Sequence, residues 1–404
     1  MYDVVIVGAR CAGAALALLL ARRGMTVAVL DRDEFPSDTL SGHYLHQCAV
    51  ARLAGWGLRD GLAALGAPAL QGMLLDLDGV VLEGEPLAVS GERFAFCPRR
   101  HLFDSWLLEQ ARAAGAHVHT GVRVDGLLCD AERVRGVVGR SRAGERLEWN
   151  ARLVVGADGM QSTVARLAGA RMVEERPSYA CNYYAYWDGL ELGRAELYVR
   201  GDGVRRFAVA APTNDGATII NVAWPQEEHE RLRGDIAGAY LATLRALPGL
   251  WEKLDGATRE PRLQGLVKNP NFIRQSAGPG WALIGDAGCH KDPVTAQGMA
   301  DALRDAEMLA DAISLTSGAN LNAAAGTYEA ARNRTIAPMF DYTCTLAQLT
   351  SPPPEMRALA LAMQSQPQAL ARFFGVMAGS VTVPEFFDPA NLGAIMQGAP
   401  ECVP

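Results

Sequence analysis

A short glycine-containing segment near the start of the chain has the residue types of a phosphate-binding turn. It reads Gly-Ala-Arg-Cys-Ala-Gly from Gly8 to Gly13, follows the apolar run 4–7 and opens a helical pattern over 11–23. The first glycine permits a tight turn, the last allows close packing of helix on strand, and the helix start offers unpaired N–H groups to a pyrophosphate. Arg10 stands where such fingerprints usually carry another glycine. The segment is therefore an incomplete dinucleotide fingerprint.

An acidic residue follows the next apolar segment. The pattern predicts a second buried strand at 26–30, and Asp31 comes directly after it, 18 residues beyond Gly13. A carboxylate at this place accepts hydrogen bonds from the two ribose hydroxyls of an adenosine. Strand, helix, strand and acid in this order predict a βαβ unit that binds a cofactor containing ADP.

The composition restricts the class of protein. The 404 residues are 49% hydrophobic and 21% charged, which is typical of a globular chain, and a prior of roughly 150 residues per domain predicts two or three domains. The net charge of -7 argues against binding to nucleic acid or to an anionic membrane. The eight cysteines fall singly, without a C-x-x-C pair, so we expect no metal site and a reducing, cytoplasmic location. We also expect no targeting segment and no membrane-spanning helix.

The middle of the chain has a different pattern from its beginning. Aromatic and β-branched residues over 178–224 predict several strands, and a polar helix is expected near 226–247. Asp78-Gly79 predicts a hairpin turn. A strand at 282–284 and a helix at about 296–313 follow, and the remainder reads as helices. The chain is thus expected to be an α/β protein with a second sheet.

Two further segments carry recognisable motifs. Residues 154–159 read Val-Val-Gly-Ala-Asp-Gly and are followed by Ser162 and Arg166. They resemble the Asp-Gly motif of flavoprotein monooxygenases, G-A-D-G-x-x-S-x-V-R, although the arginine comes two residues after Val164 instead of one. Residues 280–288, with Asp-Pro and Gln-Gly-Met after them, resemble the Gly-Asp motif of the same family.

A fourth motif completes the set. Arg100 to Leu107 resembles the family's R-x-x-F/L-D-x-x-L helix, whose arginine reaches the diphosphate of FAD. The four motifs stand in the family's order and span about three quarters of the chain, from Gly8 to Met299. The chain thus resembles the para-hydroxybenzoate-hydroxylase-like FAD superfamily. The residues around the Gly-Asp motif are similar to those of the monooxygenases of this superfamily that are related to geranylgeranyl reductases.

The resemblance implies a fold and a set of FAD contacts. It implies a Rossmann-type, glutathione-reductase-like FAD-binding domain with an inserted β-sheet substrate domain and a C-terminal helical region. Their expected ranges are 1–71, 96–177 and 270–315 for the first, 72–95 and 178–269 for the second, and 316–404 for the third. The cofactor-binding residues are expected to be Gly8, Arg10, Cys11, Ala12, Gly13, Asp31, Arg32, Arg100, Val124, Asp158, Gly285, Asp286, Pro293, Gly298 and Met299. In this family the Gly-Asp aspartate, here Asp286, bonds the ribityl chain. The helix start after Pro293 faces the pyrimidine edge, where its N–H groups stabilise the negative charge of a reduced flavin.

The activity implied by the resemblance is that of an FAD-dependent monooxygenase of secondary or catabolic metabolism. NADH or NADPH reduces FAD, O2 adds at C4a, and the hydroperoxide oxidises an electron-rich carbon of an aromatic or polycyclic small molecule. No second glycine fingerprint exists, so the nicotinamide docks transiently or a separate flavin reductase supplies the electrons.

Two other functions compete with this one. The first is a flavin-dependent reductase of prenyl C=C bonds, and the second is a flavoprotein that binds FAD without turnover. Only Ala-Trp-Pro at 223–225 matches part of the prenyl-reductase motif Y-x-W-x-F-P, and the halogenase signature W-x-W-x-I-P is absent. Both departures favour hydroxylation.

Candidate catalytic residues lie near the expected flavin ring. His43, in Ser-Gly-His at 41–43, is interpreted as a proton relay or substrate contact, with a structural histidine as the alternative. Pro293 is expected beside the ring. His290 and Lys291 are further pocket candidates, unless they are solvent-facing loop residues.

The aromatic residues of the second sheet are candidates for substrate contacts. Those proposed to line the pocket are Tyr184, Tyr186, Tyr198 and Trp224, with ordinary core packing as the alternative. Alternation along the strand places Tyr184 and Tyr186 on one face and Tyr183 and Trp187 on the other. Only one face can line a cavity. Four C-terminal phenylalanines are expected in a lid or a packing buttress, namely Phe373, Phe374, Phe386 and Phe387.

Overall fold

The computed structural model describes residues 1–131, 133–201, 205–316 and 320–398. The end of the expected C-terminal region, 399–404, with the eighth cysteine at 402, lies outside the described residues.

The first large sheet is built around the fingerprint strand. Its order is β19-β20-β10-β1-β2-β7, and β9 and β8 continue from β10 as an antiparallel meander. The strands are β1 (Tyr2–Val7), β2 (Val27–Leu30), β7 (His117–His119), β8 (Val122–Cys129), β9 (Val134–Ser141), β10 (Arg146–Gly156), β19 (Ala277–Gly278) and β20 (Trp281–Leu283). β1 pairs in parallel with both β10 and β2. Because both faces of β1 are covered, it reads as a continuous apolar run.

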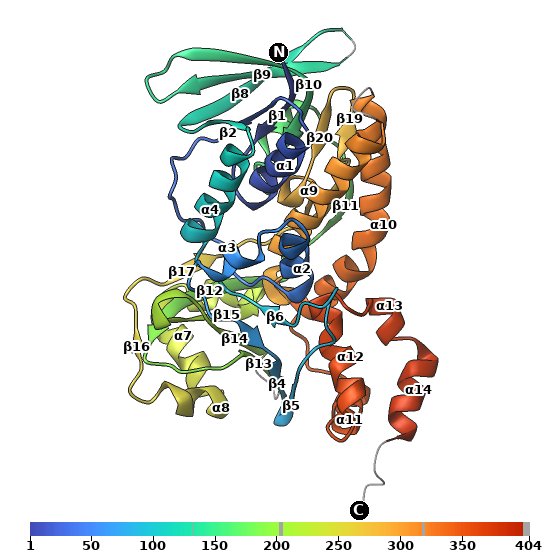
Figure 1. The fold of residues 1–404 in the computed structure, drawn as a ribbon. Coiled ribbons are helices and arrows are strands. Elements are labelled where there is room, and N and C mark those ends of the chain that lie inside the picture. Colours follow the sequence, from blue (N-terminus) through green and yellow to red (C-terminus); the bar gives the residue numbers. More distant parts are fainter. Residues whose placement is uncertain (132, 202–204, 317–319, 399–404) are drawn as a thin grey trace, which may run out of the picture.

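Different elements pack on the two faces of this sheet (Figure 1). Val4 and Ile6 face a core formed with the helices, whereas Val5 and Val7 face a core formed with β8, β9 and the base of β10. The helices on the first face are α1 (Cys11–Arg22), α4 (Arg100–Ala113), α9 (Gly298–Leu315) and α10 (Leu321–Ala347). α1 ends before Gly24, whose φ of +77° allows the left-handed turn that stops a helix.

The second large sheet comes from the middle of the chain. Its order is β16-β12-β15-β14-β13-β4-β5, with β17 also paired to β12. The strands are β4 (Met73–Leu77), β5 (Val80–Gly84), β12 (Ala180–Asp188), β13 (Ala195–Arg200), β14 (Arg206–Pro212), β15 (Thr218–Pro225), β16 (Thr258–Arg259) and β17 (Gln264–Leu266). The hairpin expected at Asp78-Gly79 is confirmed, because both residues have positive φ and join β4 to β5.

Helices cover one face of the second sheet. The single helix expected near 226–247 is wrong, because the chain breaks at Gly234. Asp235 then caps a new helix by accepting a hydrogen bond from the N–H of Gly238 at 2.8 Å. The elements here are η2 (Gln226–Glu228), α6 (His229–Leu232), α7 (Ile236–Arg245), α8 (Pro248–Trp251) and η3 (Glu252–Leu254).

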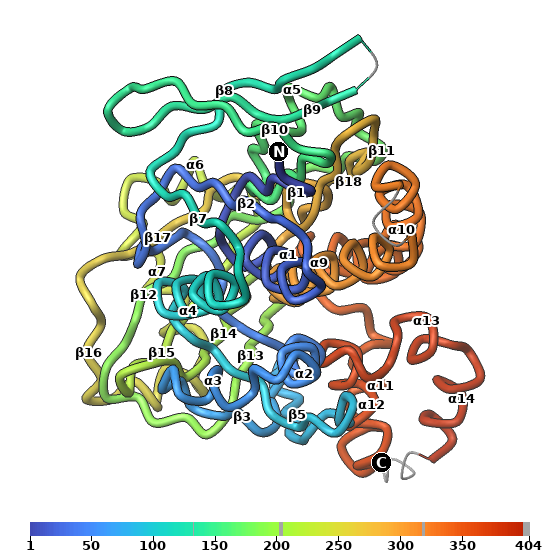
Figure 2. The backbone as a smooth tube through the Cα atoms, turned by 45° about the horizontal axis from the view of Figure 1, so that its top comes forward, coloured from blue at the N-terminus to red at the C-terminus, as the bar shows by residue number. Residues whose placement is uncertain are grey.

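The remaining elements connect and buttress the two sheets. Figure 2 shows the C-terminal helices grouped beside α2 and β5. They pack on β4 and β5 through an apolar cluster that includes Phe374 and Phe386. The C-terminal helices are α11 (Pro354–Met363), α12 (Pro367–Ala378), α13 (Val383–Phe386) and α14 (Pro389–Gln397). The connecting helices and 3₁₀ turns are α2 (Gln47–Gly55), α3 (Arg59–Ala63), α5 (Thr163–Leu167), η1 (Asn214–Gly216), η4 (Gly285–Ala287) and η5 (Pro293–Thr295). The short strands are β3 (Leu70–Gln71), β6 (Phe94–Ala95), β11 (Met172–Arg176), β18 (Asn271–Arg274) and β21 (Cys289–His290). Among the described helices, none is long and apolar enough to cross a membrane.

Candidate functional site

The turn between β1 and α1 is a tight backbone cradle. Gly8 has φ +102°, and a Cβ placed there would lie 2.3 Å from the carbonyl oxygen of Ala157. A Cβ on Gly13 would lie 1.8 Å from the carbonyl oxygen of Gly8. Only glycine fits either position. Arg10 precedes the helix in an extended conformation without capping it, and the first turn carries no acidic residue. The helix start is therefore suited to an anion.

Asp31 lies beside this cradle at the end of β2. It is 8% exposed, and its Oδ2 accepts a hydrogen bond from the N–H of Ala9 at 2.7 Å. Its Oδ1 accepts one from the N–H of Asp33 at 2.9 Å. Burial raises the pKa of this carboxyl. Each carboxylate oxygen has a second lone pair, so the group can also accept hydrogen bonds from ribose hydroxyls.

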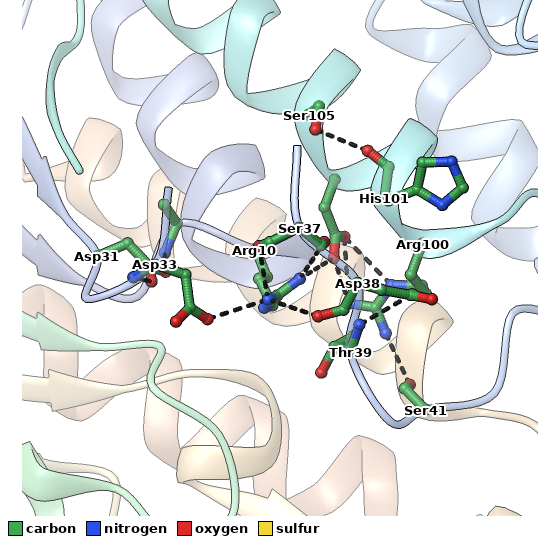
Figure 3. A network of polar contacts seen from close by, with 12 residues as sticks. Arg10, Asp31, Asp33, Ser37, Asp38, Thr39, Ser41, Arg100, His101 and Ser105 are labelled. Carbon is green, nitrogen blue, oxygen red and sulfur yellow. Dashed lines mark hydrogen bonds and ion pairs between the residues drawn. The ribbon is translucent and has the colours of Figure 1, made fainter. Parts of the chain in front are cut away.

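The side chain of Arg10 explains the missing glycine of the fingerprint (Figure 3). Its guanidinium lies 3.1 Å from a carboxylate oxygen of Asp33 and 3.1 Å from one of Asp104. It also donates to Ser37 and to the backbone carbonyl of Asp38. Arg10 thus ties the loop after β2 to α4, and its role at a cofactor phosphate stays a prediction.

Arg100 begins α4 and is held by a bidentate ion pair. Its Nη2 lies 2.9 Å from Oδ2 of Asp104, and its Nη1 donates to Oγ of Ser41 at 2.6 Å. Both members of the pair are buried. The carboxylate of Asp286 acts electrostatically on Arg100 and on the Cys11 thiol, whose pKa is raised chiefly by burial. The fingerprint, the α4 motif and the Gly-Asp motif therefore meet at one place.

Asp286 itself is exposed, although the residues on both sides of it are buried. The next motif positions lie around the start of α9: Met299 is buried, Gly298 is exposed and Pro293 is partly exposed in η5. Ala296, between them, has φ +51°, a conformation that alanine rarely adopts.

A chain of buried charges holds the Gly-Asp loop against α9. Asp305 accepts a hydrogen bond from the N–H of Gly285 at 3.1 Å and pairs with Arg304 at 2.8 Å. Arg304 also pairs with Asp301 at 2.5 Å, and Asp301 pairs with Lys291. The loop is therefore fixed near both of its ends. Lys291 is buried in this network, so the alternative of a solvent-facing lysine is wrong, and its role in a pocket stays a prediction.

The Asp-Gly motif serves the backbone. Asp158 accepts hydrogen bonds from Oγ of Ser162 at 2.5 Å and from the N–H of Thr163 at 2.7 Å, and so caps α5. Burial raises the pKa of Asp158. Arg166 is exposed. The Asp158 carboxylate thus positions the turn opposite Gly8, and its direct contact with a cofactor stays a prediction.

Arg274 belongs to none of the sequence motifs, but it connects two of them. Its Nη2 donates to the carbonyl of Met160 at 3.0 Å, and its Nη1 donates to the carbonyl of Ala287 at 3.1 Å. It thereby joins the Asp-Gly loop to the Gly-Asp loop. No local pattern marks it, because its partners are distant in sequence.

His43 contacts the second sheet. Its Nε2 lies 2.5 Å from the hydroxyl oxygen of Tyr186, and the two rings stack at 6.0 Å between centroids. The ring of Tyr184 meets His43 edge-on at 5.8 Å, and its hydroxyl donates to Gln264 at 3.1 Å. His46 reaches the other side, where its Nε2 lies 3.0 Å from the carbonyl oxygen of Thr295. The segment 41–47 therefore runs from Arg100 past the tyrosines to the start of α9.

Unpaired polar atoms gather on this segment. Among the described residues, no partner bonds Nδ1 of His43, the hydroxyl of Tyr44, Nδ1 of His46 or Oε1 of Gln47, and all four residues are at least nine-tenths buried. A buried polar atom without a partner costs about 1–3 kcal/mol. Four such atoms lie within five residues of the chain.

Two of the four predicted substrate aromatics lie elsewhere. Tyr198 and Trp224 pack with Tyr183 and Trp187 in the core between the sheet and α7 and α8. The hydroxyl of Tyr198 donates to Glu196 at 2.6 Å, within this core. The expectation that they share a surface with Tyr184 and Tyr186 is wrong, because their side chains leave the opposite face of the sheet.

Three other residues singled out from the sequence are His290, Arg32 and Val124. His290 stacks on Phe272, and its Nδ1 lies 2.5 Å from the carbonyl oxygen of Pro270, so it is a structural histidine. Arg32 is exposed and Val124 is buried in β8, and their contacts with a cofactor stay predictions. Two open cavities of about 360 and 640 Å³ flank the loop 190–194 and contain none of the predicted site residues.

The features of the cradle fit FAD. Glycines stand where a Cβ would collide, the Asp286 carboxylate is exposed and acts electrostatically on Arg100, and unpaired polar atoms lie on the segment 43–47. The chain belongs to the FAD binding domain family, whose model matches residues 1–231. Its fold and motifs are those of the FAD-dependent oxidoreductases of the superfamily that the sequence resembles.

Among curated proteins the chain is similar to FixC of Salmonella typhi, with 32% identity over 180 residues, or 43% of this chain and 40% of FixC. The match thus spans about two fifths of the length of that relative. The chain is also similar to digeranylgeranylglycerophospholipid reductase 1 of Methanopyrus kandleri. This match is 27% identical and covers 75% of this chain and 77% of the reductase.

Solved structures share the fold over nearly the whole chain. The flavin-dependent brominase Bmp2 has a TM-score of 0.80 at 19% identity and covers 98% of both chains. PqsL, described as a probable FAD-dependent monooxygenase from Pseudomonas aeruginosa, has a TM-score of 0.68 at 23% identity, over 92% of this chain and 99% of its own. At such identities the likeness establishes the fold alone.

Proposed function

We propose that the chain is an FAD-dependent monooxygenase that hydroxylates or oxidises an aromatic or polycyclic small molecule. The observation that supports this function most strongly is the buried aromatic cluster of His43, Tyr184 and Tyr186 beside unpaired buried polar atoms. In this proposal the cluster orients a flat ligand and excludes water from the reacting atoms.

The bound FAD would supply the redox chemistry, with electrons from NAD(P)H or a separate flavin reductase and with O2 as the oxidant. The residues of the chain divide the remaining work. The turn from Gly8 to Gly13 and Asp31 hold the ADP part, Asp286 holds the ribityl chain, and the start of α9 at Gly298 faces the ring. Pro293 lies at the ring edge in this proposal.

The domain division expected from the sequence belongs to the proposal as well. The ranges 72–95 and 178–269 supply the substrate-facing sheet, and the C-terminal helices buttress it through α12. The side chain of Gln297, beside the start of α9, donates to the carbonyl of Met377 in α12 at 2.9 Å. The described cysteines are all free thiols, which suits a reducing cytoplasm.

The test compares oxygen use with alkene reduction. The purified protein is loaded with FAD, and oxygen uptake is followed with NADPH or NADH, with and without an added flavin reductase, and with a panel of phenols and polycyclic aromatics. Catalase identifies oxygen that is released as peroxide. We expect one hydroxylated product for each O2 consumed beyond the catalase-sensitive fraction.

The rival function is supported by the match to the prenyl-lipid reductase. Its test is anaerobic incubation of the reduced protein with a geranylgeranyl lipid. Saturation of the alkene without oxygen would exclude the monooxygenase. Flavin reduction that never yields a product from either panel would favour an FAD-binding module without turnover.

A further inference from the structure

We propose that Lys291 keeps the start of α9 positive toward the flavin by neutralising Asp301, a buried carboxylate in the first turn of that helix. Lys291 is thus a positioning residue, because it acts on the cofactor through Asp301 and the helix start. The inference rests on the cofactor site of the proposed function, in which the start of α9 faces the flavin ring. It adds what sets the preference of that site for the reduced, anionic form of the cofactor.

The two helices that begin at the expected cofactor site differ in the charge of their first turns. α1 carries no acidic residue there, whereas α9 carries Asp301 three residues after Gly298. An anionic side chain at this place interacts with the positive end of the helix dipole itself and so opposes a second anion at the same helix start. α9 lies beside α1 (Figure 1), so its charge acts on the same region. Asp301 therefore has to be compensated if this helix start is to stabilise an anionic flavin.

Two cations compensate Asp301, one on each carboxylate oxygen. Nζ of Lys291 contacts Oδ2, and Nη1 of Arg304 lies 2.5 Å from Oδ1. Arg304 also pairs at 2.8 Å with Oδ1 of Asp305, whose Oδ2 accepts the hydrogen bond from the N–H of Gly285. Arg304 is thus shared between two carboxylates. Among the ion pairs of the described residues, Lys291 has Asp301 as its single partner.

Burial makes this compensation strong. Lys291 and Asp301 are each 8% exposed. Burial acts to raise the pKa of Asp301, but Arg304 and Lys291 together lower it below its usual value, so the carboxyl is ionised at pH 7. His46, on which Asp301 also acts, stays neutral because burial lowers its pKa to about 4. The positive charge that balances Asp301 therefore comes from Lys291 and Arg304, and solvent screens it poorly.

The pair lies among the residues that the proposed function assigns to the cofactor. Lys291 stands two residues before Pro293, and Asp301 stands three residues after Gly298. A unit charge at the range of one or two helix turns in a protein changes a reduction equilibrium by roughly tenfold. Loss of Lys291 leaves an excess negative charge in the first turn of α9. This charge disfavours the anionic, reduced flavin relative to the oxidised one.

The experiment measures the midpoint potential of the bound FAD, which needs neither substrate nor oxygen. FAD-loaded protein is reduced anaerobically together with a reference dye of known potential. Lys291→Met is expected to weaken the binding of reduced relative to oxidised FAD by roughly tenfold, which lowers the potential by about 30 mV for a two-electron couple. Lys291→Arg keeps the charge and is expected to keep the potential.

Opposite changes of charge separate this role from a merely structural one. Asp301→Asn removes the anion and is expected to raise the potential, and Lys291→Met combined with Asp301→Asn is expected to return it to the wild-type value. Arg304→Gln removes the second cation and is expected to lower the potential, so the test holds even if one variant does not fold. Lys253→Met is the matched control, because Lys253 pairs with the buried Glu196 in the second sheet.

Four outcomes would overturn the inference: unchanged potentials in Lys291→Met and Asp301→Asn, shifts of the same sign in these two variants, a shift in Lys253→Met as large as in Lys291→Met, or loss of folded, FAD-containing protein in all three single variants of the network. If FAD is bound but the expected shifts are absent, only this inference falls. If the shifts occur but no substrate is oxidised, the proposed monooxygenase falls and this inference stands. A wild-type protein that holds no FAD would overturn both.

Discussion

The Sγ atom of Cys11 lies 3.8 Å from the carbonyl oxygen of Met299, so the first turns of α1 and α9 lie side by side although 288 positions separate the two residues. The starts of the two helices therefore lie next to each other. Each offers N–H groups and the positive end of a helix dipole, which the proposed function assigns to the diphosphate and to the flavin ring.

Asp286→Ala is expected to yield largely FAD-free protein. The Asp286 side chain is exposed and makes no hydrogen bond to any described residue, so its loss removes the proposed ribityl contact and no internal hydrogen bond. The melting temperature of the FAD-free protein should therefore stay unchanged while flavin absorbance per chain falls. Asp255→Ala, at another exposed aspartate in the second-sheet region, is the control. Full flavin content in the Asp286 variant would contradict the assignment.

Asp31→Ala is expected to weaken FAD binding by about 1–3 kcal/mol, the cost of losing a buried hydrogen-bond acceptor. Asp31→Asn keeps one carbonyl oxygen and should lose less. Both dissociation constants can be measured by quenching of flavin fluorescence. Equal affinity of wild type and Asp31→Ala would remove Asp31 from the ribose site.

Arg274→Met is expected to loosen the two motif loops together. The methionine keeps most of the apolar stem, but the hydrogen bonds to Met160 and Ala287 are lost, at about 1–3 kcal/mol of stability in all. Urea unfolding measures that loss, and FAD affinity should fall as well. Arg171→Met removes an exposed arginine that contacts Gln275 and should change neither. Wild-type affinity in Arg274→Met would show that the bridge does not position the cofactor loops.

Ala296→Gly is expected to raise the free energy of unfolding by up to about 1 kcal/mol, because φ +51° is strained for alanine and ordinary for glycine. The same change in a helix, Ala394→Gly in α14, should lower it by about 1 kcal/mol. Chemical denaturation of the three proteins gives the comparison. A destabilised Ala296→Gly variant would mean that packing of the methyl group outweighs the strain.

His46 is expected to make stability fall on acidification. Burial lowers the pKa of His46 to about 4. Below pH 6.5 His46 is therefore protonated in the unfolded chain while it stays neutral in the folded chain. Between pH 7 and pH 5 this difference lowers the free energy of unfolding by about 2 kcal/mol, since each pKa unit corresponds to about 1.36 kcal/mol. His46→Gln keeps a donor for Thr295 and should lose that much less over the same interval.

The difference between the two proteins isolates His46, because other groups titrate in both. Asp292 is one of them. Burial raises its pKa to about 7, and its contribution has the opposite sign because the folded state takes up the proton first. Identical pH profiles for wild type and His46→Gln would contradict the prediction.

The local patterns of the sequence were enough to predict the βαβ unit, the order of the four motifs and the hairpin at Asp78-Gly79. Each depends on residues close together in the chain, where periodicity and backbone preference act directly. The motifs also indicated the family and the fold. Gly8 and Gly13 can be recognised in the sequence because a Cβ at either position would collide with backbone atoms.

Only the tertiary structure decided which distant groups meet. Alternation placed Tyr184 and Tyr186 on one face, but packing of helices on the other face of the sheet determined that this face meets His43. The burial of Lys291 and the bridge made by Arg274 likewise depend on segments that are remote in sequence. Periodicity specifies which side chains share a face, whereas the partner of that face is set by how all the apolar surfaces are buried at once.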